Sequence, residues 1–157
     1  MLIFVPYGGD PLLWTHRLAN LNLPEFHLLD RETPPETDTR HRAAEIVNLR
    51  PQCRAVVTAK RNLECYLHPD AVFEASGINV DFSDQDPVAE LVARRRRNSD
   101  RQMPWDDLPQ RSRRRHCARV KKWLNTRAVE QMTPARLAER DPGGEVVSWL
   151  RTIARLA

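Results

Sequence analysis

A strand, a helix and a second strand follow one another early in this chain, and this order is the feature that most constrains its fold. The strands are expected at Glu25–Leu29 and Cys53–Thr58, which are short and largely apolar. Between them, apolar residues recur at helical spacing over Asp38–Leu49. A helix is the usual crossover between parallel strands. The pattern therefore predicts an α/β fold with a mostly parallel sheet and right-handed connections.

The residues before Glu25 extend the same pattern. Leu2–Tyr7 is almost wholly apolar, as expected of a buried parallel strand. A glycine pair that permits a tight turn comes next, followed by an Asp-Pro pair typical of a helix start. Trp14, Leu18 and Leu21 then recur at helical spacing, which predicts a helix with one apolar face.

The remainder of the chain is predicted to be mainly helical. Short helical segments are expected at Lys60–Leu67 and Asp70–Ser76, and a strand-like stretch follows at Ile78–Phe82. A second Asp-Pro pair then begins a helix that runs into a block of arginines. We therefore expect two regions: an α/β core over residues 1–83 and a basic helical region over residues 84–157.

Composition excludes several classes of protein. Hydrophobic residues make up 41% of the 157 residues, which is enough for a packed core. No apolar run approaches the roughly 20 residues that cross a bilayer, and the N-terminus lacks the basic region of a signal peptide. Cys53, Cys65 and Cys117 have neither the number of a disulfide framework nor the spacing of a zinc site. We expect a cytoplasmic protein without a membrane segment.

The net charge of +4 is unevenly distributed, because acidic residues lie mainly in the first ninety positions. Clustered basic residues are the electrostatic signature of a protein that binds phosphate backbones. Two alternatives remain: a solvated basic face without a ligand, and a surface for an acidic partner protein. The basic residues concerned are Arg94, Arg95, Arg96, Arg97, Arg113, Arg114, Arg115, Lys121 and Lys122.

Charged side chains also follow the two predicted strands. Asp30 and Glu32 come after Glu25–Leu29, and Lys60 and Glu64 come after Cys53–Thr58. Open parallel sheets bind ligands at the carboxyl ends of their strands. Two carboxylates there can reach one Mg²⁺, a third can complete the site or hold a second ion, and a lysine can stabilise developing negative charge. The alternative is an ordinary surface loop that happens to carry two acids.

Two longer segments, FHLLDRETPPETDTR and KRNLECYLHPDAV, make the chain resemble a known family over roughly residues 2–75. It resembles the Toprim domain of the OLD (overcoming lysogenization defect) family of ATP-dependent nucleases. In that family a hydrophobic strand ends in an acidic DxD-type motif, and a later basic segment carries a glutamate followed by an aromatic residue and a leucine. The matching positions are Asp30, Glu32, Lys60, Arg61, Glu64, Tyr66 and Leu67.

The resemblance implies a Toprim-like (Rossmann-like) fold and a nuclease that hydrolyses DNA phosphodiester bonds with Mg²⁺ or Mn²⁺. It implies that Asp30, Glu32 and Glu64 bind metal, that Lys60 and Glu64 are catalytic, and that Arg61 joins the basic residues in binding nucleic acid. It further implies an ABC-type ATPase domain or subunit as a partner, besides DNA. A homo-oligomer is also possible.

Two departures from the family pattern affect this expectation. The strand with an EGxxD-like motif that opens Toprim domains is missing, so the sheet is expected to be incomplete at its N-terminus. The GxxxxGK[ST] phosphate loop is missing as well, so the chain alone should not hydrolyse ATP. Two rival hypotheses follow: a non-catalytic nucleic-acid-binding or partner-docking module, and a structural remnant without activity.

Overall fold

The computed structural model describes residues 2–6, 8–99 and 103–156, which form two compact units. The first unit comprises residues 1–61 together with residues 143–157, and the second comprises residues 62–142. The boundary expected near residue 83 therefore falls inside the second unit. The last helix, α6 (Glu145–Leu156), belongs to the first unit, although its sequence follows the basic region.

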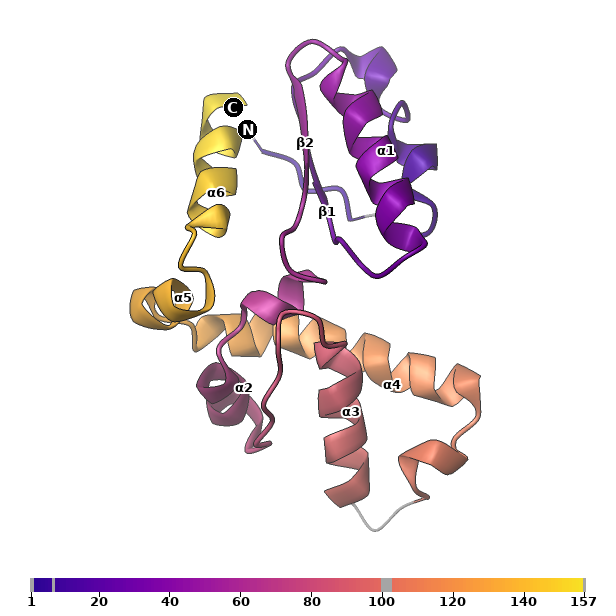
Figure 1. Cartoon of the computed structure of the whole chain (residues 1–157), viewed down its shortest axis with the longest axis vertical. Coiled ribbons are helices and arrows are strands. Elements are labelled where there is room, and N and C mark those ends of the chain that lie inside the picture. Colours follow the sequence, from indigo (N-terminus) through magenta and orange to yellow (C-terminus); the bar gives the residue numbers. More distant parts are fainter. Residues whose placement is uncertain (1, 7, 100–102, 157) are drawn as a thin grey trace. The chain divides into compact units, whose positions relative to one another are not determined.

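A parallel strand pair forms the centre of the first unit. Strand β1 (Glu25–Leu29) pairs with β2 (Cys53–Val57), in a register that sets Glu25 opposite Cys53 and Leu29 opposite Val57. Helix α1 (Glu36–Asn48) is the crossover between them (Figure 1). The α/β class and the parallel pairing are confirmed. Within the described ranges the sheet has two strands.

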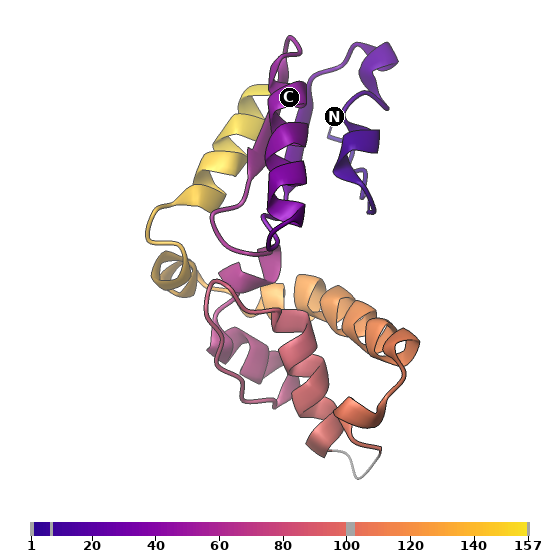
Figure 2. The same ribbon diagram turned by 45° about the vertical axis from the view of Figure 1, so that its right-hand side comes forward.

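Helices cover both faces of this sheet. The face that carries Leu29 and Ala55 packs against Ala43 and Val47 of α1, and all four side chains are buried. Helix α6 contacts β1 and lies on the other side of the strands from α1 (Figures 1 and 2). Its Trp149 is 7% exposed. Coverage on both faces is the usual setting of a parallel strand pair.

The strand expected at Leu2–Tyr7 is not observed. Leu2–Pro6 lies outside the sheet and is exposed, Phe4 to 84%, while Tyr7 is outside the described residues. An apolar run becomes a strand only when another strand pairs with it, and that partner is not encoded locally. The Asp10 carboxylate does cap the helical turn η1 (Pro11–Trp14), accepting a hydrogen bond from the Leu12 N–H.

The single helix expected around Trp14–Leu21 is instead two short turns, η1 and η2 (Ala19–Leu21). The second unit is helical around one apolar core, in which Val72, Trp105 and Leu124 are buried. Its elements are η3 (Leu63–Tyr66), α2 (Pro69–Ser76), α3 (Val88–Ser99), η4 (Trp105–Asp107), α4 (Gln110–Trp123), the π-helical η5 (Leu124–Ala128) and α5 (Pro134–Arg140).

The strand-like stretch Ile78–Phe82 is also not a strand. It is irregular, and Phe82 is buried in the core while Ile78 and Val80 pack against it. Its alternating apolar residues therefore face a helical core rather than a sheet. Alternation alone cannot distinguish these two environments.

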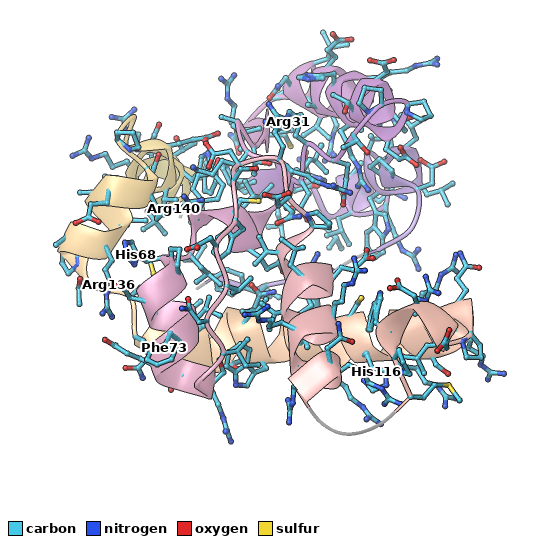
Figure 3. The ribbon with its side chains drawn as sticks, turned by 60° about the horizontal axis from the view of Figure 1, so that its bottom comes forward. Arg31, His68, Phe73, His116, Arg136 and Arg140 are labelled. Carbon is cyan, nitrogen blue, oxygen red and sulfur yellow. The ribbon has the colours of Figure 1, made fainter. Side chains whose placement is uncertain are left out.

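Arginines of α5 hold this helix to the rest of the second unit. The Arg136 guanidinium donates to the Glu74 carboxylate at 2.5 and 2.7 Å, and Arg140 donates to the Cys65 carbonyl at 2.6 Å. His68 Nε2 lies 3.1 Å from the Glu139 carboxylate. Figure 3 labels His68, Arg136 and Arg140, which lie near one another. These arginines are therefore structural.

Candidate functional site

The segments that follow β1 and β2 remain joined beyond the ends of the strands. The Thr58 N–H donates to the Leu29 carbonyl at 2.9 Å, and the Glu32 N–H donates to the Arg61 carbonyl at 2.8 Å. Parallel pairing thus places the residues after β1 beside the residues after β2. Asp30 and Glu32 therefore follow β1, and Lys60 and Arg61 follow β2, at the same end of one sheet.

Thr58 connects these two segments through its side chain. Its hydroxyl donates to the Lys60 carbonyl at 2.7 Å and accepts from the Arg31 N–H at 3.0 Å. The residue is 1% exposed, so both hydrogen bonds are shielded from water. In the sequence, Thr58 is recognisable only as the end of a predicted strand. A threonine that ends an apolar strand just before a basic pair is the signal that could have identified it.

A second residue that sequence analysis missed is Glu145, in the first turn of α6. Its carboxylate accepts a hydrogen bond from the Ala59 N–H, at 3.0 Å to one oxygen and 3.3 Å to the other. The segment after β2 is therefore fixed by a residue from the far end of the chain. The long separation in sequence is the reason that no local pattern indicated this contact.

Glu32 has an unusual backbone conformation. Its φ angle is +58°, in the left-handed region that residues other than glycine rarely adopt. The Glu32 carboxylate lies 3.9 Å from the Nε atom of Arg61, and both side chains are partly exposed. Strained backbone positions cluster at functional sites, and they persist only where the surrounding structure holds them in place. Here the hydrogen bond from Glu32 to the Arg61 carbonyl is part of that support.

Lys60 is largely buried at 8% exposure, while Asp30 and Arg61 are partly buried. The edge of the sheet thus combines two carboxylates with two positive side chains. Burial lowers the effective dielectric and strengthens their interactions with a charged ligand. This combination suits a ligand that itself pairs a cation with phosphate oxygens.

Glu64 belongs to the second unit, and its surroundings there are those of a structural carboxylate. It is 1% exposed and accepts a hydrogen bond from Asn125 Nδ2 at 3.0 Å. The Lys121 ammonium lies 3.7 Å from the same carboxylate. A buried charge needs such partners to offset its loss of hydration. The role of Glu64 as a metal ligand and catalytic residue stays a prediction from the resemblance.

The metal expectation can be tested against the donor set. Among the residues that the structure describes, no group of three or more His, Cys, Asp or Glu side chains is placed to hold a metal ion. Mg²⁺ commonly uses only one or two carboxylates and keeps several waters or substrate oxygens. Asp30 and Glu32 fit this mode of binding. They do not fit a closed zinc site, which needs four protein ligands.

Part of the predicted nucleic-acid surface is used for internal contacts. Arg94 pairs with Asp106 at 2.9 Å, and Arg97 donates to the Met103 carbonyl at 2.9 Å. Arg113 donates to the carbonyls of Leu108 and Asp106. These guanidinium groups contact Met103, Asp106 and Leu108, which lie in or beside η4. Exposure and internal contact are not exclusive, because Arg94 is exposed and exposed Lys121 lies 3.7 Å from the Glu64 carboxylate. The other exposed residues of the predicted set are Arg95, Arg96, Arg114, Arg115 and Lys122.

His116 of α4 lies close to several arginines, which affect its pKa. Burial and then neighbouring guanidinium groups, Arg97 first, lower the pKa of His116 below its usual value. Its ring lies edge-on to Trp105, with 6.3 Å between the ring centroids. An imidazole that resists protonation is expected where the local potential is already positive.

Comparison with known proteins gives no match to a family model, to a curated protein or to a solved structure. Across the described residues, no helix is both long enough and apolar enough to cross a bilayer. The motifs at the strand ends and the geometry around them are therefore the basis for a functional proposal.

Proposed function

We propose that this chain is the Toprim-like part of a divalent-metal-dependent endonuclease that hydrolyses phosphodiester bonds of DNA. The observation that carries the proposal is the hydrogen bond between the Glu32 N–H and the Arg61 carbonyl. It joins the acidic segment after β1 to the basic segment after β2. Two carboxylates suited to a hard cation and two cations suited to phosphate therefore share one edge of a parallel sheet.

In this proposal Asp30 and Glu32 hold Mg²⁺ or Mn²⁺, and Lys60 and Arg61 face the phosphate. The metal would supply a Lewis acid for the phosphodiester. Lys60 stabilises the negative charge that develops during cleavage, and its burial strengthens this effect. Thr58 and Glu145 are positioning residues, since they fix the backbone around Lys60. An ABC-type ATPase partner belongs to the proposal through the family resemblance alone.

A plasmid-nicking assay with Mg²⁺ or Mn²⁺ tests the proposal. The wild-type chain should nick, and Asp30→Asn and Glu32→Gln should each remove nicking in both metals. The matched control is Glu45→Gln, an exposed carboxylate on α1 that should have no effect. Equal nicking by Asp30→Asn and the wild type would refute the proposed metal site.

The second candidate function is a non-catalytic nucleic-acid-binding module. It is favoured by α4, which contains no acidic residue and carries exposed Arg114, Arg115 and Lys122. If no metal supports nicking while DNA binding persists in EDTA, this second function replaces the first. A nuclease that also binds through α4 would show both metal-dependent nicking and EDTA-resistant binding.

A further inference from the structure

A hollow of about 600 Å³ lies in the second unit, between the end of α2, α3 and the junction of α4 with η5. Its lining residues include Gly77 and Asn79, two arginines of α3, and Trp123 and Arg127 from the α4–η5 junction. This volume is within the range of about 300–1,000 Å³ that is usual for small-ligand sites. Neither the family resemblance nor the proposed metal site accounts for it.

The charge of this hollow is entirely positive among its described lining residues. Arg95 and Arg96 come from α3, Arg127 comes from η5, and no carboxylate side chain joins them. A concave surface of one sign concentrates the electric field and attracts ligands of the opposite sign. Guanidinium groups in particular match the geometry of phosphate oxygens.

Trp123 gives the hollow an aromatic wall. The side chain is half-buried: it packs against the core of the second unit and also lines the hollow. In the sequence, Trp123 stands at helical spacing from Val120 and next to Leu124, which predicts a core residue rather than a platform for a base. The structure places it in both settings, and an indole anchored by the core is a rigid surface for stacking.

A neighbouring hollow of about 400 Å³ shares Asn79 and Arg95 with the first. The two hollows are therefore neighbours along α3. Asp81 also lines the smaller hollow, so the larger hollow at Trp123 is the better site for phosphate.

We infer that the hollow at Trp123 binds single-stranded nucleic acid, with a base stacked on the Trp123 indole and phosphates on Arg95, Arg96 and Arg127. A single strand is favoured because a base must be unstacked from its neighbours to reach the indole. The inference deepens the proposed function by naming the form of nucleic acid that is held. It rests on that function only for the ligand class, and it requires neither metal nor Asp30.

Fluorescence anisotropy of the full chain in EDTA tests this site with three labelled probes. These are a short oligothymidylate, an abasic strand with the same number of phosphates, and a duplex of the same length. The wild type should bind the oligothymidylate about fivefold to a hundredfold more tightly than the abasic strand, which is the range of one stacked base. It should also prefer the oligothymidylate to the duplex.

The variants separate stacking from charge. Trp123→Leu should abolish the preference for bases over abasic sites, and Trp123→Phe should retain most of it. Arg127→Gln should weaken both single strands alike and reduce the salt dependence by about one phosphate contact. The matched control, Arg111→Gln, removes an exposed guanidinium of α4 that does not line the hollow, and it should bind like the wild type.

Equal affinity of the wild type for oligothymidylate and abasic strands would overturn the inference, as would a loss in Arg111→Gln equal to that in Arg127→Gln. If Trp123→Leu does not fold, Trp123→Phe and Arg127→Gln decide the question. Binding that survives in EDTA without any nicking in Mg²⁺ would contradict the proposed nuclease and leave this site intact. Nicking in Mg²⁺ without a preference for oligothymidylate over the abasic strand would contradict the site at Trp123 and leave the proposed nuclease intact.

Discussion

The N–H of Glu32 donates a hydrogen bond of 2.8 Å to the carbonyl of Arg61, although the two residues follow different strands. This bond and the Thr58 hydroxyl act on the same two segments. The proposed site therefore depends on backbone contacts as much as on its charged side chains. Variants that disturb these contacts without removing a charge are the most informative.

Thr58→Val keeps the shape of the side chain but removes the hydroxyl that bridges Arg31 and Lys60. Two buried backbone groups then lose a partner, which should lower the free energy of unfolding by about 1–3 kcal/mol. Nicking should fall as well, while Thr58→Ser should stay close to the wild type. Urea unfolding of the three proteins measures the change. No difference between Val and Ser would show that the hydroxyl does not support this edge.

Glu32→Gly and Glu32→Ala both lack the carboxylate but differ in their tolerance of a φ angle of +58°. Glycine adopts this region at no steric cost, whereas alanine pays about 1–2 kcal/mol. We expect the glycine variant to be the more stable of the two by about 1 kcal/mol and both to be inactive. Thermal unfolding gives the comparison, and an alanine variant that matches the glycine variant would contradict it.

Glu25 should make the first unit sensitive to acid. Its carboxylate is hydrogen-bonded to His27 Nε2 at 2.8 Å and to the Arg50 guanidinium. Burial alone would raise the pKa of Glu25, but the contacts with Arg50 and His27 outweigh it and hold the pKa below its ordinary value of 4.5. A carboxylate with a lowered pKa stabilises the fold above its unfolded-state pKa, and this contribution is lost as the pH falls below about 4.5.

Denaturant unfolding at pH 7 and at successively lower pH tests this expectation. Glu25→Gln should be less stable than the wild type at pH 7, and the difference should shrink as the pH falls below about 4.5. Glu45→Gln, at an exposed position on α1, should show neither effect. A difference between wild type and Glu25→Gln that is constant with pH would contradict the assignment.

The N-terminal segment Leu2–Pro6 is exposed in the structure, whereas its sequence pattern predicts a buried strand. Ile3 and Phe4 are 70% and 84% exposed, so Ile3→Ser and Phe4→Ser should change the free energy of unfolding by less than about 0.5 kcal/mol. Leu29→Ala, at 3% exposure in β1, should cost about 2–5 kcal/mol. Large losses at Ile3 and Phe4 in chemical denaturation would instead support a buried strand.

The parts of the fold that were predictable are those with local causes. The strand at Glu25–Leu29 matches β1 in full, because its apolar run and its flanking loop are both local signals. The strand expected at Leu2–Tyr7 was wrong, because pairing depends on a partner elsewhere in the chain. Asp30 and Glu32 were recognisable by type and spacing. The Thr58 hydrogen bonds and the left-handed Glu32 depend on tertiary contacts.

The sequence also does not distinguish basic residues that make structural contacts from those that are exposed. Sequence alone could not separate Arg113, which binds the carbonyls of Leu108 and Asp106, from Arg114 and Arg115, which are exposed. All three are consecutive and chemically identical, so only their direction from α4 distinguishes them. The burial of Glu64 beside Asn125 is likewise a product of helix packing within the second unit.

The first unit is assembled from two separate stretches of chain, residues 1–61 and 143–157, while the second is continuous. This has a consequence for synthesis on the ribosome. The continuous unit can fold as soon as it emerges, in keeping with the tendency of domains to fold as units. The sheet gains the cover of its second face only after α6, which follows the second unit in the chain, has been made. Until then, the face that α6 covers and the Ala59 N–H that Glu145 satisfies are open to water, chaperones or other nascent chains.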